Sequence, residues 1–405
     1  MNSSLGSYDG SVKSRFILGL KKSSQLFTTA IATIHALVPY PAGPAKPLWF
    51  GARYTGRDRD AAVERGLQFI EGIASNTEHF AEWGHDLLWC FYTISRTAKN
   101  EKLRAMARRM GEGHARHWRS EHTEVPVDDA DDLSLFVFGT DIADQFLDGS
   151  DPLLKRRIQE AAQRFSAVDF LCFDPRREAP PNDIPESCPK CEHDSPRGIM
   201  ICRKCNAVLR PRSPYDIWLD ALVTTYSGDT YGVALGASYP EVLQWISQMR
   251  PYPAPSENQE QFDDVSYAIT HVVYTLNEYG KYRLSPAWLP QEFNYLRTHI
   301  REAERYRDWE TVGEFMDTLR AFGLDETDHE VRAGLNYLLA NQNPDGSWGD
   351  MKDTDIYNRY HSTWTAIDGL RQYAFQGERL RYPDLLPLLR GDHDVPAQPK
   401  ANAKT

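Results

Sequence analysis

The sequence has no run of about twenty apolar residues, which a membrane-spanning helix requires. Its most apolar stretch, 26–38, is short and includes several polar residues, and Lys21 and Lys22 interrupt any signal-like segment before it. An excess of basic residues is missing too, because 46 Lys and Arg stand against 57 Asp and Glu, for a net charge of −11. This balance argues against general nucleic-acid binding. We therefore expect a soluble, cytoplasmic protein without a membrane span.

Several catalytic signatures are also missing. The sequence has no Gly-rich phosphate loop, no dinucleotide-binding fingerprint and no nucleophile elbow around a serine. None of the common nucleotide-dependent or serine-hydrolase classes is therefore indicated. What the 405 residues do contain is 41% hydrophobic and 12% aromatic side chains, enough for a substantial core.

Cysteine is scarce, with six in the chain, but four of them form two Cys-x-x-Cys pairs. Cys188 and Cys191 are separated by ten residues from Cys202 and Cys205. Each pair can turn two thiolates toward one centre, and the intervening hairpin can bring the pairs together, as a structural zinc requires. Two disulfides or a redox dithiol are the alternatives, and a cytoplasmic setting disfavours them.

The segment that holds these cysteines, 175–214, is rich in proline and cannot be helical. We expect an inserted zinc ribbon on one loop. The ribbon is basic in an otherwise acidic chain, through Lys190, Arg197, Arg203, Lys204, Arg210 and Arg212. It is either a solvated knuckle that stabilises a long loop or a docking surface for an acidic protein partner or substrate.

The rest of the chain repeats a pattern of about 45 to 50 residues, in which a charged amphipathic helix precedes a more apolar one. The charged helices are expected at 57–75, 102–119, 152–168, 239–249, 290–305 and 328–341. The apolar helices are expected at 83–97, 132–147, 215–225, 265–279, 309–322 and 360–374. Because the second set is apolar nearly all round, it must be buried on most faces. The alternation predicts an all-α (α/α)6 toroid whose inner ring is the buried set.

This pattern also divides the chain. The toroid is expected to comprise 51–174 and 215–390, with the ribbon inserted at 175–214. Residues 1–50 are expected to form an N-terminal helix and a Pro-rich linker, and residues 391–405 a disordered tail.

The stretch from Gln342 to Asp350 reads Gln-Asn-Pro-Asp-Gly-Ser-Trp-Gly-Asp. It resembles the QW motif of terpenoid cyclases such as squalene–hopene cyclase and the class II diterpene cyclases. The Tyr360-His361 pair is similar to the opening of the last inner helix in the protein farnesyltransferase β subunit, where the His binds zinc. The chain thus resembles the terpenoid cyclase/protein prenyltransferase superfamily, which implies a toroid with an aromatic-lined cavity. In that family an Asp-x-Cys also accompanies the metal site. Here Asp308 is followed at position 310 by a glutamate in place of the cysteine, so no thiolate is available from this helix. The remaining ligands are harder, which favours iron over zinc.

Polar residues at equal depth on successive inner helices would converge on a central cavity. Counting back from the helix ends gives the ring His85, Asp141, Asp220, His271, Glu314 and His361. His85, His271, Glu314 and His361 form the predicted catalytic metal set, because His with carboxylate suits non-heme iron or zinc. The alternative is that they are satisfied core residues, since one residue of register error turns a ligand by about 100° around its helix.

Asp129-Ala130-Asp131-Asp132 matches the DxDD motif of class II terpene cyclases, which implies Asp131 as a proton donor. With Asp220, it is the predicted catalytic residue. The alternative is that these carboxylates cap a helix N-terminus. Class II cyclases also build their cavity between two helical domains, and only one toroid fits here. Candidates for the aromatic cavity lining are Trp89, Trp218, Tyr267, Tyr274 and Trp364.

These patterns together predict a metal-dependent enzyme that acts on a mostly apolar, isoprenoid- or polyketide-like small molecule. The predicted ligands favour oxidative chemistry at a non-heme iron over Lewis-acid chemistry at a zinc ion. One alternative is acid-initiated cyclisation by Asp131, as in a terpene cyclase-like isomerase or lyase. The other is a non-catalytic adaptor that binds a partner through the ribbon.

Overall fold

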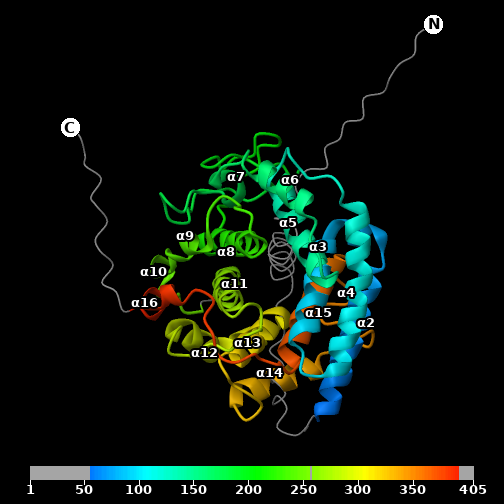
Figure 1. The fold of residues 1–405 in the computed structure, drawn as a ribbon. Helices are drawn as coiled ribbons and strands as arrows, with labels where there is room; N and C mark the ends of the chain where they lie inside the picture. The colour runs from blue at the N-terminus through cyan, green and yellow to red at the C-terminus, as the bar shows by residue number, and fades with distance from the viewer. Residues whose placement is uncertain (1–54, 256–257, 392–405) are drawn as a thin grey trace.

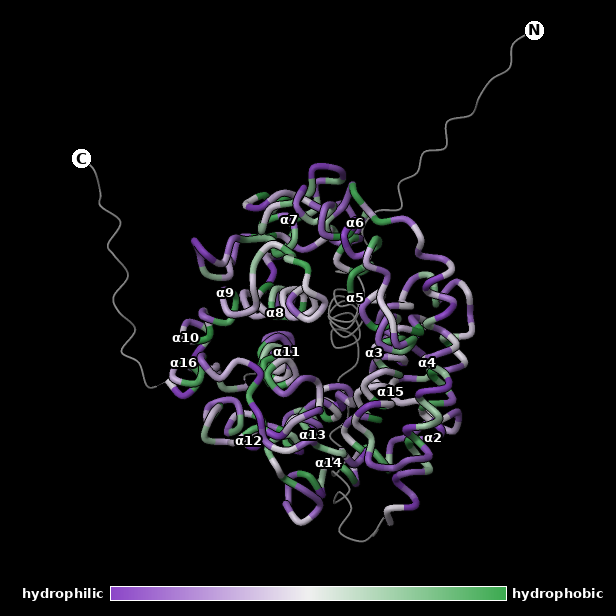
Figure 2. The backbone as a smooth tube through the Cα atoms, viewed as in Figure 1, coloured by the Kyte–Doolittle hydropathy of each residue, from purple (hydrophilic) through white to green (hydrophobic). Residues whose placement is uncertain are grey.

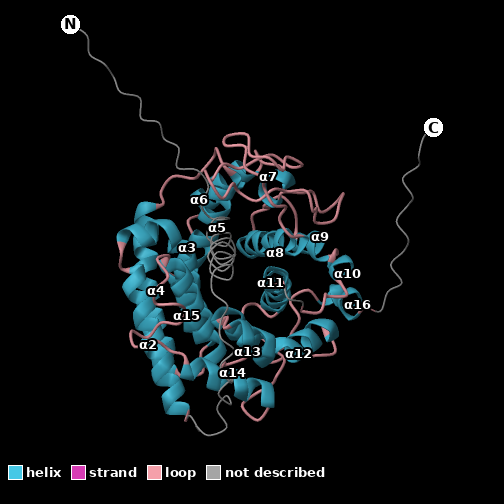
Figure 3. Ribbon diagram, turned by 180° about the vertical axis from the view of Figure 1, so that it is seen from behind, coloured by secondary structure: helices cyan, strands magenta, loops and turns pink. Residues whose placement is uncertain are grey.

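A computed structural model describes residues 55–255 and 258–391 (Figure 1). The predicted N-terminal helix and the tail beyond residue 391 lie outside these ranges. The described part of the chain is all-α: it contains helices and isolated β-bridges but no strand (Figure 3). None of its helices is both long enough and apolar enough to cross a membrane.

The alternation of charged and apolar helices is present in the structure. The charged members are α2 (Gly56–Ala74), α4 (Glu101–Glu121), α6 (Pro152–Ala162), α9 (Tyr239–Leu243) with α10 (Ile246–Met249), α12 (Pro290–Tyr306) and α14 (His329–Ala340). The apolar members are α3 (Thr77–Thr97), α5 (Ala130–Phe146), α8 (Pro214–Tyr231), α11 (Gln259–Leu276), α13 (Trp309–Ala321) and α15 (Ile356–Leu370). The remaining elements are α7 (Ala167–Leu171), the 3-10 helix η1 (Pro383–Leu385) and α16 (Leu386–Arg390).

The helix starts follow from local chemistry. Most begin after an Asn, Asp, Ser or Thr whose side chain accepts a backbone N–H of the first turn, which satisfies donors that have no partner within the helix. Such caps are Thr55, Asn76, Asn100, Asp129, Asp151, Ser213, Asn258, Asp308 and Asp355. Two expected helices are interrupted: 152–168 stops at Ala162, and 239–249 divides into α9 and α10. Beside that second break, the side chains of Gln244 and Trp245 donate to the carbonyl of Pro175, at 2.9 and 2.8 Å.

The apolar helices pack on one another in chain order: α3 on α5, then α8, α11, α13 and α15. The first and last of them are joined where the segment after α15 meets the end of α3. There the N–H of Ala374 donates to the carbonyl of Thr97 at 2.7 Å, and the guanidinium of Arg371 donates to the hydroxyl of Thr97, also at 2.7 Å. Helix α2 packs on both α15 and α3. In Figure 2 the peripheral loops are mostly hydrophilic, whereas apolar residues recur along the helices between them.

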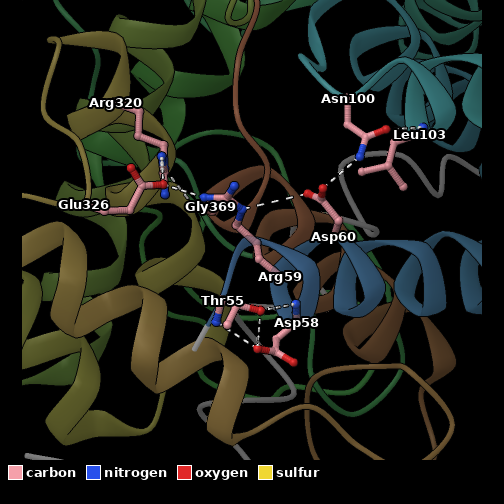
Figure 4. Close-up of polar contacts among 9 residues, drawn as sticks. All are labelled: Thr55, Asp58, Arg59, Asp60, Asn100, Leu103, Arg320, Glu326 and Gly369. Carbon is pink, nitrogen blue, oxygen red and sulfur yellow. Dashed lines mark hydrogen bonds and ion pairs between the residues drawn. The ribbon is translucent and has the colours of Figure 1, made fainter. Parts of the chain in front are cut away.

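Helices α13 and α15 approach each other unusually closely, and two glycines make this possible. A Cβ on Gly313 would lie 2.4 Å from the carbonyl oxygen of Thr365, and one on Gly369 would lie 2.8 Å from that of Gly313. Real Cβ atoms essentially never come within 3.0 Å of such atoms. The carbonyl of Gly369 also accepts from Nε of Arg320 at 3.1 Å, and Glu326 links that arginine to Arg59 of α2 (Figure 4). The polar side chains of both helices are thereby held face to face.

The segment that resembles a QW motif ties three helices together. Trp348 is fully buried, and its Nε1 donates to the carbonyl of Leu338 in α14 at 2.8 Å. Its backbone N–H donates to the hydroxyl of Thr363 in α15 at 2.9 Å. Gln342 donates to the carbonyl of Ala62 in α2 at 2.8 Å. These contacts link α2, α14 and α15.

Candidate functional site

Two groups of side chains could hold a metal ion or a substrate, and the four cysteines of the ribbon form the first. Their sulfur atoms all lie within 4.8 Å of one another, with Cys188 3.3 Å from Cys205 and Cys191 3.6 Å from Cys202. Tetrahedral zinc with Zn–S bonds of about 2.3 Å would hold its sulfurs roughly 3.8 Å apart. All four are free thiols, so the cluster could bind a metal ion such as zinc.

The two Cys-x-x-Cys turns have the same backbone geometry. The residue after the second cysteine, Glu192 or Asn206, is left-handed, with φ of 55° and 58°. In each turn its N–H donates to the carbonyl of the first cysteine at 2.8 Å. The N–H of that first cysteine, Cys188 or Cys202, donates to a carbonyl five residues further on, at 3.2 and 2.8 Å. The sequence therefore builds two matching turns whose thiols face one point.

The ribbon is anchored to the helical body through its last arginine. Arg212 is 3% exposed, and its guanidinium donates to Asp216 at 2.6 Å and also pairs with Asp220. Burial lowers the pKa of Arg212, but the two carboxylates raise it well above its ordinary value. Asp220, predicted as a catalytic residue of the inner ring, is thus one of the acids that fix the ribbon to α8.

A small cavity of about 50 Å³ forms the second candidate site. Helices α3, α11, α13 and α15 contribute to it. Its charged and titratable lining consists chiefly of His271, Glu314, Asp317, His361, Asp368 and Arg371. Its aromatic lining is Tyr274, Tyr279 and Trp364. Of the aromatic residues predicted from the sequence to line a cavity, Tyr274 and Trp364 do so.

The structure brings together three of the four predicted metal ligands. His271, Glu314 and His361 come from α11, α13 and α15 and line the same cavity. The ligand atoms of these three residues do not all lie within 4.8 Å of one another. Among the described residues, only the four cysteines form a group of potential metal ligands that close together. His85 does not line the cavity. Its ring lies 6.0 Å from that of Phe138, and burial lowers its pKa to about 3.

His271 and Glu314 each have one polar atom held by a neighbour. The Nδ1 of His271 lies 2.9 Å from the carbonyl oxygen of Tyr267, and Thr270 donates its hydroxyl to Oε2 of Glu314 at 2.6 Å. Burial lowers the pKa of His271 to about 3, so its imidazole is neutral, the form that binds metals. Burial raises the pKa of Glu314 well above its ordinary value, although the hydrogen bond from Thr270 acts to lower it. The Nε2 of the histidine and Oε1 of the glutamate are the atoms left for a ligand.

His361 lies beside an acid, in an ion pair whose two facing atoms do not meet hydrogen-bond geometry. Its Nδ1 lies 2.9 Å from Oε1 of Glu310, one turn before Glu314 on α13. Burial lowers the pKa of His361, but Glu310 and, more weakly, Asp86 and Glu314 raise it to about 9. The ring is therefore an imidazolium in this structure, and a metal would bind its Nε2 in exchange for a proton.

The predicted acid Asp131 lies at the start of α5. Oδ1 of Asp129 accepts the backbone N–H groups of Asp131 and Asp132, at 2.8 and 3.1 Å, so the motif includes a helix cap. Neither Asp131 nor Asp141 lines the cavity. Burial raises the pKa of Asp141 to about 6, and Gln145 donates to its carboxylate at 3.1 Å. Asp129 is thus the N-cap, and Asp131 lies in the first turn of α5, outside the cavity lining.

Sequence reasoning missed Asp317, Asp368 and Arg371. Asp317 lies three residues after Glu314 and Asp368 seven after His361, spacings that place each pair on one face of its helix. A search for polar residues at this spacing on the apolar helices would have found both acids. Arg371 lies just beyond the end of α15 and has no such signal.

Comparison of the chain with protein-family models, with curated proteins and with solved structures finds no match.

Proposed function

We propose that the helical body is an (α/α)6 toroid of the terpenoid cyclase and prenyltransferase kind. Three observations support this: the alternation of charged and apolar helices, the packing of the apolar set in chain order, and the contacts that join α15 to α3. The segment around Trp348, which links α2, α14 and α15, is consistent with the resemblance to a QW motif.

We further propose that the protein is a metal-dependent enzyme that acts on a mostly apolar small molecule in the cavity of this toroid. The observation that carries the proposal is the shared pattern of His271, Glu314 and His361. Each lines the cavity and has one polar atom beside a partner, with a second left for a ligand: the partners are the Tyr267 carbonyl for His271, the Thr270 hydroxyl for Glu314 and, as an ion pair, Glu310 for His361. Metal-binding histidines typically use their other ring nitrogen in this way, toward a carbonyl or a carboxylate.

The donor set indicates which metal fits. Two histidines and one carboxylate form the facial triad of non-heme iron(II) enzymes, which supplies oxidative chemistry when the iron is bound. The chain's own residues would prepare the site. Tyr267 and Glu310 orient the two imidazoles, and Glu310 stabilises the proton that His361 must release. Tyr274 and Trp364 give the cavity an apolar wall that fits an apolar substrate and limits access of water.

Cobalt(II) as an optical probe tests this site. We expect protein whose ribbon is already loaded with zinc to bind one further equivalent of Co2+, with visible d–d absorption. His271→Ala and His361→Ala should lose that absorption because each removes a ligand. His329→Ala, a change at an exposed histidine of α14, should retain it. Equal binding by all four proteins would show that the cavity is not the metal site.

We also propose that the ribbon cysteines hold a structural zinc and that the ribbon is a docking surface for an acidic protein. The second point rests on a surface patch. Ile201 and Val208 pair across the ribbon and are 57% and 79% exposed. In the same segment, Lys190, Arg203 and Lys204 are exposed and form no ion pair with the described residues. The ribbon's other basic residues, Arg197, Arg210 and Arg212, do pair with acids.

A protein fits this patch better than a nucleic acid does. Segment 175–214 contains no Phe, Tyr or Trp on which a base could stack, and its two exposed apolar residues are aliphatic. We expect Arg203→Glu to weaken binding of a peptide of alternating Glu and Leu, measured by fluorescence anisotropy. Arg157→Glu, an exposed change of equal charge on α6, is the control. Equal loss in both variants would indicate only a general charge effect.

A further inference from the structure

The turn that follows helix α11 has an unusual backbone. Glu278, Tyr279 and Gly280 are three consecutive left-handed residues, with φ of 55°, 50° and 81°. Residues other than glycine rarely adopt this conformation, so the first two make the turn strained. Such strain persists only where the surrounding structure fixes it, and it clusters where a side chain is placed for function. The side chain that this turn places is Tyr279, which lines the cavity.

Contacts on both sides fix the turn. The N–H of Tyr279 donates to the carbonyl of Tyr274 in α11 at 2.7 Å. Oδ1 of Asn277, a residue only 1% exposed, accepts the N–H of Gly280 at 2.9 Å. Gly280 also lies against the segment after α15, because a Cβ at this position would be 2.5 Å from the ring of Tyr373. The position of Tyr279 is therefore set by its neighbours and not by its own backbone preference.

Aromatic rings from three helices surround the ring of Tyr279. Its centre lies 4.7 Å from that of Trp89 in α3, 5.3 Å from that of Tyr226 in α8 and 5.7 Å from that of Tyr274 in α11. Its hydroxyl, in contrast, forms no hydrogen bond with any described residue. Burial raises the pKa of Tyr279 well above its ordinary value, so the phenol is neutral and can donate. This hydroxyl is therefore a donor available to a ligand in the cavity.

Tyr279 lies close to the proposed metal ligands. The ring of Tyr274 is 5.3 Å from that of His271 and 5.7 Å from that of Tyr279, so the two outer rings are no more than about 11 Å apart. The cavity of about 50 Å³ offers the space of roughly four water molecules. It therefore admits a molecule of few heavy atoms, or one end of a larger molecule.

We propose that Tyr279 selects the substrate by donating a hydrogen bond to a carbonyl or hydroxyl oxygen at the end of an otherwise apolar molecule that enters this cavity. The inference rests on the proposed function for the presence of a substrate here. Tyr274 and Trp364, which also line the cavity, contact the apolar part. A molecule without the oxygen would leave the enclosed phenol unpaired, which is costly, so the site discriminates against it.

Two probes of similar shape test this role. Cyclohexanone carries a carbonyl oxygen where methylenecyclohexane carries a CH2 group, and NMR titration measures the affinity for each. We expect Tyr279→Phe to weaken binding of the ketone by about two- to tenfold, the equivalent of one net hydrogen bond, and to leave binding of the hydrocarbon unchanged. The thermal midpoint should hardly change, because the hydroxyl has no protein partner to lose. Tyr226→Phe removes a hydroxyl from the neighbouring ring, outside the cavity lining, and should bind both probes as the wild type does.

Equal loss of both probes in Tyr279→Phe would show that the residue only shapes the cavity, and no loss of either would show that its hydroxyl does not reach the ligand. Each result overturns the inference. Should the variant fail to fold, wild-type protein labelled with carbon-13 at the tyrosine Cζ replaces it. The ketone but not the hydrocarbon should then shift one tyrosine signal, and the absence of such a shift would overturn the inference.

Two further results separate this inference from the proposed function. If neither probe binds the wild type, the cavity does not admit an apolar molecule, and the proposed substrate and the role of Tyr279 are both wrong. Binding of Co2+ should be the same in Tyr279→Phe as in the wild type. A failure of the metal site would therefore appear with Co2+, and a failure of this inference alone would appear with the ketone.

Discussion

The close contact between α13 and α15 predicts a strong effect of adding one methyl group at Gly313. In Gly313→Ala, the new Cβ would lie 2.4 Å from the carbonyl oxygen of Thr365 and 2.8 Å from the amide nitrogen of Ala366. Both are backbone atoms, so no side chain can turn aside and the helices must separate. Overpacking of this kind costs about 1–3 kcal/mol, and the better helix propensity of alanine returns at most about 1 kcal/mol. With a contact this short, we expect a net loss of about 2 kcal/mol.

The matched control is Gly72→Ala, in helix α2, where a Cβ would meet no atom within 4 Å. That variant should gain about 0.5–1 kcal/mol, because only the conformational preference changes. Urea unfolding followed by far-UV circular dichroism measures both free energies of unfolding. Equal stability of the two alanine variants would refute the claim that Gly313 permits the close approach.

Three further predictions concern the ribbon and the core. Cys202→Ser should lose the ribbon metal and become sensitive to limited proteolysis at the ribbon, while the helical circular dichroism persists; an unchanged metal content would contradict this. Glu292→Gln should lower the free energy of unfolding by about 3–5 kcal/mol, because the fully buried glutamate accepts two bonds from Arg250, at 2.8 and 2.6 Å; a urea midpoint equal to that of the wild type would be the contrary result. Trp348→Phe should cost about 1–3 kcal/mol, since the smaller ring leaves a space in the core and the carbonyl of Leu338 keeps only the N–H of Asn341 as donor. Thermal unfolding at the wild-type temperature would contradict this.

The helices were predictable because their signals are local. Apolar residues at three- and four-residue spacing mark each buried face, and caps such as Asn76 and Asp308 mark the starts. The metal-binding potential of the cysteines was equally accessible, since two matched Cys-x-x-Cys turns specify their own geometry. The breaks after Ala162 and at Gln244 carried no comparable signal. Helix ends were also missed elsewhere: α8 continues to Tyr231 instead of ending at residue 225, and α11 begins at Gln259 instead of at residue 265.

Only some of the cavity-lining residues were predicted, because the rotation of each helix about its own axis decides which side chains face the cavity. Thr93 of α3 lines the cavity, and His85, eight residues earlier, is turned from it by about 80°. Asp86, seven residues earlier, is turned by only about 20° and lies near His361, whose pKa it raises. The prediction was therefore one residue out of register on this helix. Asp220 does not line the cavity for another reason: its carboxylate pairs with Arg212 of the ribbon, and no periodicity in the sequence reveals where the ribbon docks.

We propose that the chain holds two metals of different kinds, and elemental analysis of the purified protein tests this proposal most directly. We predict one zinc and one iron per chain, with the zinc lost in Cys202→Ser and the iron lost in His361→Ala. One zinc per chain, lost only in Cys202→Ser and unaffected by His361→Ala, would contradict the account.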